Sequence, residues 1–291
     1  MQGNCTIGLV QMESIVGETK NNIAKITSIA ERAALAGVDI LCFPEMAMHG
    51  YAPREAENLA ESLTGANVQI ISDFAIKLGI TLLVGMAEKR VDTGKPYLTH
   101  MVAFADGRLG VYRKTHLGRN EEDYFSPGDG FPVFHTHGTC FGVGLCWDWH
   151  FPEVATIYSL KGAEILFAPH ASPKVSGDRK ELWLRYLGAR AYDNTVYLGA
   201  CNVFGSNGKG QEFQGGALVL GPKGEILAES FDEQERLLLA ELSGERINAL
   251  RCNSHRSMKE KFFLAQRKKE LYREIIELDA PVPKNQPLGD A

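Results

Sequence analysis

The chain has 291 residues, of which 44% are hydrophobic, so it is long enough to bury a large core in a single domain. Its formal net charge of −5 and its dispersed Lys and Arg residues lack the basic stripe of a nucleic-acid-binding protein, so we expect no nucleic-acid partner. No apolar run reaches the roughly 18 residues of a membrane-spanning helix, and the N-terminus has neither the basic segment nor the apolar core of a signal peptide. We therefore expect a cytoplasmic protein without a membrane partner.

The cysteines and histidines lack the pattern of a redox or metal site. Six cysteines are spread along the chain without close pairs, which fits a reducing compartment better than a disulfide framework. Cys140 and Cys146 are too far apart for a Cys-x-x-Cys redox motif. His135 and His137 have a spacing that can ligate a metal, but no third ligand clusters near them in sequence. The sequence therefore predicts no metal site.

The first part of the chain alternates strands with helices. Buried strands are predicted at residues 5–12, 38–43 and 80–87, where apolar residues dominate. Amphipathic helices are predicted between them, at residues 18–36 and 66–78. This order indicates right-handed crossovers and a largely parallel sheet.

The rest of the chain contains shorter strands and longer loops. Asp106-Gly107 is a hairpin signal between predicted strands at 98–105 and 109–113, and a long loop follows at 115–130. Further strands are predicted at residues 139–145, 163–167, 196–200, 215–220, 225–229 and 236–242, and further helices at 152–161 and 178–193. The chain therefore has two comparable halves without a linker between them.

The stretch from Gly142 to Glu153 contains the cysteine with the clearest chemical setting. The strand pattern stops at Cys146, and Pro152-Glu153 then opens a helix with proline and an acid in its first turn. Such a strand-to-helix turn holds a side chain above the end of a sheet, with backbone N–H groups nearby to receive a developing oxyanion. The other five cysteines have no comparable setting and are interpreted as small core residues.

Two other segments place ionisable side chains at the C-terminal ends of strands. Glu45 follows the predicted strand 38–43, and Lys114 follows the predicted strand 109–113. Ligand crevices of α/β sheets lie at these strand ends. A carboxylate can take the proton of a thiol, and an ammonium can hold the negative charge that forms when a thiolate adds to a carbonyl.

Together these segments resemble the signature of the nitrilase superfamily of carbon–nitrogen hydrolases, whose members carry a Glu–Lys–Cys triad. The matching motifs are Phe-Pro-Glu45, Tyr-Arg-Lys114-x-His-Leu and Cys146-x-Asp148-x-x-Phe-Pro-Glu153. The resemblance runs from Ile7 to Leu242. It implies an α/β fold, a four-layer α-β-β-α sandwich of two mixed sheets, in a hydrolase domain of residues 1–255.

The resemblance also implies a reaction. The expected reaction is hydrolysis of a non-peptide C–N bond in a small amide or N-carbamoyl amine, with release of ammonia and without a cofactor. Cys146 is expected to form a thioester acyl-enzyme, and Glu45 is expected to transfer the protons. Lys114 and the backbone N–H of Trp147 are expected to stabilise the oxyanion.

Two further acids have expected roles near this triad. Superfamily amidases that resemble this chain carry a second glutamate in the loop after the lysine, where it orients the substrate amide and holds the lysine in place. That position is Glu121, with Glu122 as the alternative if the register differs by one residue. Otherwise Glu122 is interpreted as part of a solvated acidic loop. Asp148 is expected to brace the turn at Cys146 rather than to take part in the chemistry.

The predicted substrate pocket uses bulky side chains around Cys146, namely Tyr51, Trp149, His150 and His170. Relatives that bind N-carbamoyl amino acids are expected to place an arginine after the cysteine motif to hold the carboxylate. This chain has Trp149-His150 there instead. The departure argues against an α-carboxylate substrate and leaves neutral or cationic amides and N-carbamoyl amines open.

Two other functions remain as alternatives. A nitrilase would use the same triad to attack a nitrile carbon, and it ranks second because most of the superfamily resembles amidases. A non-catalytic scaffold would keep the fold without the reaction. The presence of Glu45, Lys114 and Cys146 together disfavours the scaffold.

The last part of the chain, residues 256–291, is predicted to be a helical extension. Residues 258–278 are rich in Lys, Arg and Glu and carry apolar positions that need a surface to pack on. In related enzymes C-terminal segments commonly reach across a dimer, so we expect this segment at the interface of a homodimer or higher homo-oligomer. The alternative is a helix folded back on its own domain. Residues 281–291 are expected to be extended or disordered.

Overall fold

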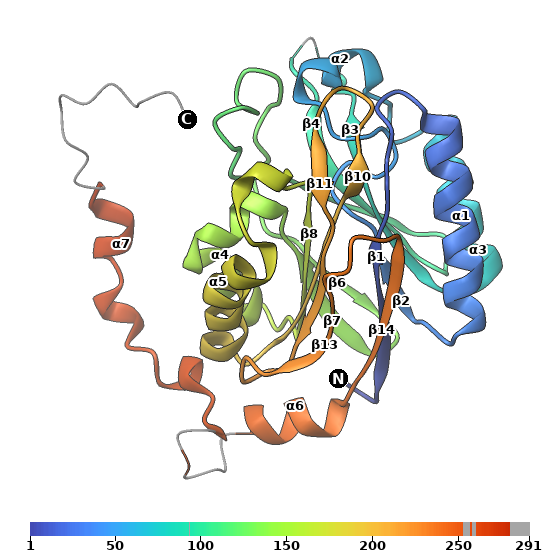
Figure 1. Cartoon of the computed structure of the whole chain (residues 1–291). Helices are drawn as coiled ribbons and strands as arrows, with labels where there is room; N and C mark the ends of the chain where they lie inside the picture. Colours follow the sequence, from blue (N-terminus) through green and yellow to red (C-terminus); the bar gives the residue numbers. More distant parts are fainter. Residues whose placement is uncertain (93, 253–256, 258–259, 280–291) are drawn as a thin grey trace.

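The computed structural model describes residues 1–92, 94–252, 257 and 260–279. These residues form two six-stranded sheets that lie face to face, with helices on both outer faces (Figure 1). One sheet has the order β14 (Arg236–Leu242), β1 (Cys5–Gln11), β2 (Ile40–Cys42), β3 (Thr81–Glu88), β4 (Tyr97–Ala103) and β5 (Leu109–Arg113). The other has the order β13 (Ile226–Ser230), β12 (Ala217–Leu220), β9 (Tyr197–Asn202), β8 (Ile165–His170), β7 (Thr139–Val143) and β6 (Val133–Thr136).

Both sheets are mixed, with the same internal plan. In the first sheet β1, β2 and β3 are parallel, with Ile7 opposite Ile40, while β14, β4 and β5 are added antiparallel to their neighbours. In the second sheet β7, β8 and β9 are parallel, with Phe141 opposite Ile165, and the outer strands are antiparallel. The four-layer sandwich of two mixed sheets is therefore confirmed. The short strands β10 (Phe204–Ser206) and β11 (Glu212–Gln214) pair with each other in a separate two-stranded sheet.

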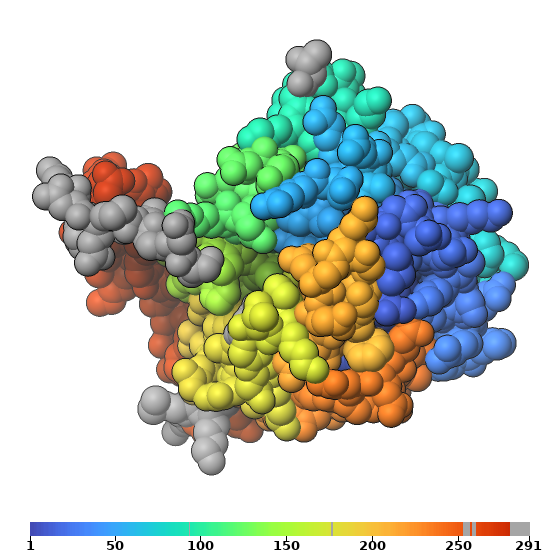
Figure 2. Space-filling model, turned by 45° about the horizontal axis from the view of Figure 1, so that its top comes forward, coloured from blue at the N-terminus to red at the C-terminus, as the bar shows by residue number. Residues whose placement is uncertain are grey.

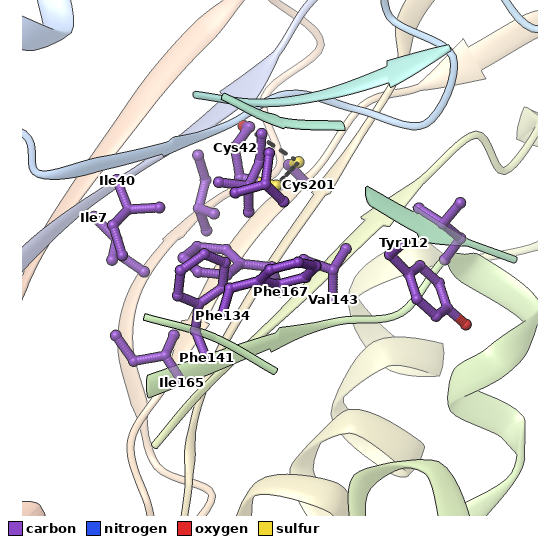
Figure 3. Packing of buried hydrophobic residues seen from close by; sticks show 14 of the residues in the cluster. Ile7, Ile40, Cys42, Tyr112, Phe134, Phe141, Val143, Ile165, Phe167 and Cys201 are labelled. Carbon is purple, nitrogen blue, oxygen red and sulfur yellow. Dashed lines mark hydrogen bonds between the residues drawn. The ribbon is translucent and has the colours of Figure 1, made fainter. Parts of the chain in front are cut away.

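The central core lies between the two sheets. Ile7, Ile40 and Cys42 from the first sheet meet Phe141 and Phe167 from the second, and all five are fully buried (Figure 3). The rings of Phe141 and Phe167 pack edge to face with their centroids 5.6 Å apart. Aromatic and branched side chains of this kind bury much apolar area per residue, so this layer holds the two sheets together.

The helices cover the outer faces because each carries an apolar stripe. Helix α1 (Thr19–Leu35) buries Ile23, Ile26, Ala30 and Ala33 against the first sheet, where α3 (Ala66–Leu78) lies beside it. Helices α4 (Pro152–Leu160) and α5 (Arg179–Asn194) cover the second sheet in the same way. Within the described part of the chain, no helix is long and apolar enough to cross a bilayer.

The C-terminal segment differs from the predicted single helix. After α6 (Gly244–Arg251), residues 260–279 contain only short helical turns, at Phe263–Gln266, Lys269–Leu271 and α7 (Glu274–Glu277). Leu271, Ile275 and Ile276 are exposed, whereas the ring of Phe263 packs against Tyr192 of α5 with the centroids 5.8 Å apart. The segment projects from the side of the molecule that carries α4 and α5 (Figures 1 and 2). A helix draws most of its stability from packing its apolar face, and Leu271, Ile275 and Ile276 remain exposed in the described chain. The predicted tail at 281–291 lies outside the described residues.

Candidate active site

Three ionisable side chains meet where the two sheets end. Glu45 lies in the turn after β2, and Lys114 is the first residue after β5. The Lys114 Nζ atom lies 2.8 Å from Oε1 of Glu45 and 2.9 Å from Oε1 of Glu121, which comes from the loop after β5. All three side chains are almost completely buried. One ammonium is therefore held between two carboxylates that are out of contact with bulk water.

Hydrogen bonds to other segments fix the two carboxylates. The second oxygen of Glu45 accepts a 2.9 Å bond from the backbone N–H of Ala171, just beyond β8 in the other sheet. Glu121 accepts bonds from the Tyr51 hydroxyl at 2.7 Å and from the Gly118 N–H at 2.6 Å. Glu122, in contrast, is exposed. Glu121 is therefore the loop acid that contacts Lys114.

Cys146 begins a 3-10 turn, Cys146–His150, between β7 and α4. Its backbone has a φ of 41°, a left-handed conformation that is unfavourable for residues other than glycine. The Sγ atom lies 3.4 Å from Oγ of Ser172 and faces a cavity of about 350 Å³ that is also lined by Lys114 and Glu121. Met46, next to Glu45, has a φ of 54°. Local strain of this kind is typical of functional turns.

Asp148 connects the cysteine turn to the lysine strand. Its buried carboxylate accepts hydrogen bonds from the Leu145 N–H and the Tyr112 hydroxyl, both at 2.7 Å, and from the Thr115 hydroxyl and the His116 N–H, both at 2.9 Å. Leu145 precedes Cys146, and Tyr112 to His116 flank Lys114. The position agrees with the bracing role expected for this residue.

Burial sets the protonation of the cluster. It raises the pKa of Glu45 to about 7, although the neighbouring Lys114 ammonium opposes the shift. Burial also raises the pKa of the Cys146 thiol to about 12, and the charge of Glu45 acts in the same direction. Burial alone would lower the pKa of Lys114, but the Glu45 and Glu121 carboxylates together raise it above its ordinary value. The arrangement thus combines a neutral thiol, a permanent cation and a carboxyl group that titrates near neutrality.

Two of the four predicted pocket residues line the cavity, and two do not. Tyr51 and His150 line it. Trp149 is 0% exposed, belongs to the core under α4 and α5, and donates its indole N–H to the Gly144 carbonyl at 2.8 Å. His170 is also 0% exposed, because β8 extends to this residue, whereas the predicted strand ended at residue 167. It lies behind Tyr186, whose hydroxyl is 3.1 Å from Nε2. The pocket assignments of Trp149 and His170 are therefore wrong.

Sequence reasoning missed several residues that do line the cavity. Arg179, Leu182 and Tyr186 come from one face of α5, and Ser172 comes from the loop after β8. The three helical residues are spaced by three and four positions, which is the spacing of one helix face. This spacing was visible in the predicted helix 178–193. The direction of this helix face relative to Cys146 was not visible in the sequence, because it depends on how α5 packs on the sheet.

Potential metal ligands do not gather in the described chain. Within residues 1–92, 94–252, 257 and 260–279, His, Cys, Asp and Glu side chains form no group of three or more that could hold a metal ion. His135 is exposed on β6, and His137 lies 3.5 Å from an oxygen of Asp39.

Residues 6–251 match the carbon-nitrogen hydrolase family. The chain therefore belongs to this family, and its recognition as a member of the nitrilase superfamily is confirmed. It is a hydrolase acting on carbon–nitrogen bonds other than peptide bonds.

Individual relatives cover most of the chain. The N-carbamoylputrescine amidase of Arabidopsis thaliana is 35% identical over 260 residues, which span 80% of this chain and 85% of that protein. The nitrilase of Pyrococcus abyssi is 30% identical over 263 residues, which span 84% of this chain and 94% of that protein. The crystal structure of an amidase from Nesterenkonia sp. superposes with a TM-score of 0.80 at 26% identity, covering 93% of this chain and 96% of that one.

Proposed function

We propose that this hydrolase cleaves the C–N bond of a small amide or N-carbamoyl amine and releases ammonia, with Cys146 as the nucleophile. Glu45 transfers the protons, and Lys114 with the backbone N–H of Trp147 stabilises the oxyanion. Glu121 holds Lys114 and orients the substrate amide. The observation that carries the proposal is the Lys114 ammonium, held 2.8 Å from Glu45 and 2.9 Å from Glu121 at the wall of the cavity that Cys146 also lines.

The proton positions support a stepwise reaction. Cys146 is a thiol at neutral pH, so its proton leaves as the sulfur attacks, and the carboxylate of Glu45 accepts it. The carbonyl oxygen becomes an anion beside Lys114 and the Trp147 N–H. Glu45 returns the proton to the nitrogen, ammonia departs, and a thioester remains. Glu45 then deprotonates a water molecule, which attacks the thioester and releases the carboxylic acid and the thiol.

A structural relative supports the cysteine as nucleophile. A mutant of the Nesterenkonia sp. AN1 amidase shows covalent addition of the acetamide moiety of fluoroacetamide at its active-site cysteine; that structure is 26% identical and has a TM-score of 0.80. Cys146 is the cysteine that faces the cavity of this chain. Cys42 and Cys201 are buried in the core between the sheets and have no access to it.

The second candidate function is that of a nitrilase. The relative from Pyrococcus abyssi bears this name, and the same triad can add a thiolate to a nitrile carbon. Ammonia release from amides and nitriles with matched side chains separates the two functions. We expect the amides to be hydrolysed with the higher kcat/KM. A preference for nitriles would reverse the order of the two candidates.

The experiment for the chemistry is detection of the thioester by mass spectrometry of the intact protein. Native protein quenched during turnover should carry an acyl adduct on Cys146, whereas Glu45→Gln should carry none, because the variant lacks the base that accepts the thiol proton. Cys146→Ala should neither form the adduct nor release ammonia. Cys140→Ala is the matched control, since this thiol is half-buried on the strand that leads to Cys146 and should be dispensable. Amide turnover by the Cys146→Ala variant would refute the proposal.

We also propose a homodimer or higher homo-oligomer in the cytoplasm. The exposed apolar residues Leu271, Ile275 and Ile276 support an interface at the C-terminal segment, and the six free cysteines fit a reducing compartment. Light scattering of the full chain and of a chain ending at residue 255 tests the interface. We expect the truncated chain to form particles with fewer subunits, and an unchanged number of subunits would contradict the proposal.

A further inference from the structure

Arg179 is a buried cation in the wall of the Cys146 cavity. It is the first residue of α5, its exposed fraction is 5%, and it lines the same cavity as Cys146 and Lys114. The Nε and Nη2 groups of its guanidinium are buried and have no hydrogen-bond partner among the described residues. Buried N–H groups without acceptors are costly, because they have lost their hydration without gaining a hydrogen bond.

Nearby carboxylates do not compensate this charge. Asp178 uses its side chain to accept a 2.7 Å bond from the Glu181 N–H at the start of the helix, and Glu181 pairs with Arg185. The ion pairs among the described residues include none with Arg179. Lys114, the other buried cation of the cavity, has two carboxylates of its own. Arg179 is therefore the cavity cation, within the described chain, that lacks an anionic partner.

Arginines with a structural role in this fold have their N–H groups satisfied. Arg251 donates to the carbonyls of Thr195 and Ala163, at 3.1 and 2.6 Å. Arg190, on the same helix as Arg179, donates to the carbonyls of Trp149 and His150. Arg179 has no comparable carbonyl partners for Nε and Nη2. This difference separates a ligand-binding arginine from one that ties segments together.

The surroundings of Arg179 suit an anion. Arg179 stands at the N-terminus of a helix of 16 residues, where the helix dipole also favours negative charge. The imidazoles nearby add no competing charge. Burial, together with the charge of Arg179, lowers the pKa of His170 well below its ordinary value, and burial with the charges of Arg190 and Arg179 lowers that of His150.

We propose that the cavity takes amides that carry a carboxylate at the end remote from the scissile bond, and that Arg179 binds this carboxylate. A planar guanidinium matches a carboxylate with two parallel hydrogen bonds. The inference rests on the proposed amide hydrolysis at Cys146 and specifies its substrate class. It also revises the interpretation of the sequence. There, the absence of an arginine after the cysteine motif left neutral or cationic amides and N-carbamoyl amines as the candidate substrates. The arginine comes from α5 instead.

The test compares amides of equal length that differ in terminal charge. Succinamate and glutaramate are the anionic probes, butanamide and pentanamide are uncharged, and 4-aminobutanamide and 5-aminopentanamide are cationic. We expect the native protein to prefer the anionic probes at least about 10-fold in kcat/KM over the uncharged ones, since charge-assisted hydrogen bonds are strong. Equal values for the three series would overturn the proposal.

Variants of α5 assign the preference to one side chain. Arg179→Gln should lower the ratio of kcat/KM for anionic amides to kcat/KM for uncharged amides by about 10- to 100-fold. Arg179→Lys should lower this ratio less, because lysine keeps the positive charge but lacks the planar pair of N–H donors. Arg185→Gln is the matched control on the same helix, because it removes an equal charge whose side chain is 71% exposed, and it should leave the ratio within about twofold. An unchanged ratio in Arg179→Gln would refute the assignment.

A binding measurement separates this proposal from the hydrolase proposal. Calorimetry with Cys146→Ala should show glutaramate binding at least about 10-fold tighter than pentanamide, and Arg179→Gln in that background should remove the difference. If this result holds while the native protein releases no ammonia, the anion site stands and the proposed chemistry fails. Equal binding of the two amides overturns the anion site, even if both are hydrolysed. Thermal melting of each variant verifies that it is folded.

Discussion

The Tyr112 hydroxyl donates a 2.7 Å hydrogen bond to Oδ2 of Asp148 and thereby joins the strand that ends at Lys114 to the turn that begins at Cys146. The same oxygen accepts the Leu145 N–H at 2.7 Å. The two sheets contribute one side each to this contact, since Tyr112 belongs to β5 and Leu145 follows β7. The distance between lysine and cysteine is therefore set by a buried carboxylate that does not face the substrate.

Replacement of this carboxylate should affect stability and activity together. Asp148→Asn places an N–H₂ group among donors, so at least one buried N–H or O–H loses its acceptor. We expect the free energy of unfolding to fall by about 3 kcal/mol and kcat/KM to fall with it. Tyr112→Phe removes a single bond and should cost about 1 kcal/mol. Urea unfolding followed by fluorescence measures both, and equal losses for the two variants would contradict the network.

The acidic loop after β5 offers a matched pair of substitutions. Glu121→Gln removes the buried charge that contacts Lys114 and should lower kcat/KM by about 100-fold, because Lys114 loses one of the two groups that position it. Glu122→Gln changes an exposed neighbour and should stay within about twofold of the native value. Ammonia release by purified variants gives the comparison. Similar losses in both would assign the effect to the loop and not to Glu121.

The pH dependence should report Glu45. The carboxylate is the form that accepts the proton, and burial raises its pKa to about 7 from an ordinary value of 4.5. Because this form disappears below the raised pKa, kcat/KM should fall about tenfold for each pH unit below 7 and level off above it. The negative charge of Glu121 contributes to the raised pKa, so Glu121→Gln should move the midpoint to lower pH. A midpoint near 4.5 in the native protein would contradict the assignment.

Sequence reasoning predicted the triad region because each of its residues sits in a short motif at the end of a strand. Glu45 and Lys114 follow β2 and β5 of the first sheet, Cys146 follows β7 of the second, and Lys114 and Cys146 line the same cavity where these strands end. The two-sheet architecture was implied by the resemblance to the nitrilase superfamily, since the alternation of strands and helices alone indicated only a largely parallel sheet. Local pattern was sufficient for the strand ends that carry the three residues.

Features that depend on packing could not be predicted from the sequence. Trp147 and Trp149 lie in one 3-10 turn, yet Trp147 is 46% exposed and Trp149 is 0% exposed, because the turn directs them to opposite sides. Nothing in the local sequence distinguishes these two tryptophans. Arg179 enters the cavity only because α5 packs on the second sheet with its N-terminus toward the site. Such contacts depend on the angle and register between elements.

The close approach of β3 to the Glu45 turn gives a last prediction. Gly85 lies under this turn, and a Cβ atom at residue 85 would be 2.3 Å from the Met46 nitrogen and 2.7 Å from the Pro44 carbonyl oxygen. These are backbone atoms, so Gly85→Ala must displace the turn that carries Glu45. We expect a loss of about 2 kcal/mol in the free energy of unfolding and about 100-fold in kcat/KM, since small shifts of a catalytic group are costly.

Gly188→Ala is the control for this substitution, because a Cβ atom in the middle of α5 would meet nothing within 4 Å. It should leave kcat/KM unchanged and stabilise the protein by about 0.5 to 1 kcal/mol, because alanine loses less backbone entropy in a helix than glycine. Thermal melting and ammonia release give both quantities. Full activity of Gly85→Ala would contradict the prediction, because it would show that the reaction does not depend on the close contact between β3 and the turn that carries Glu45.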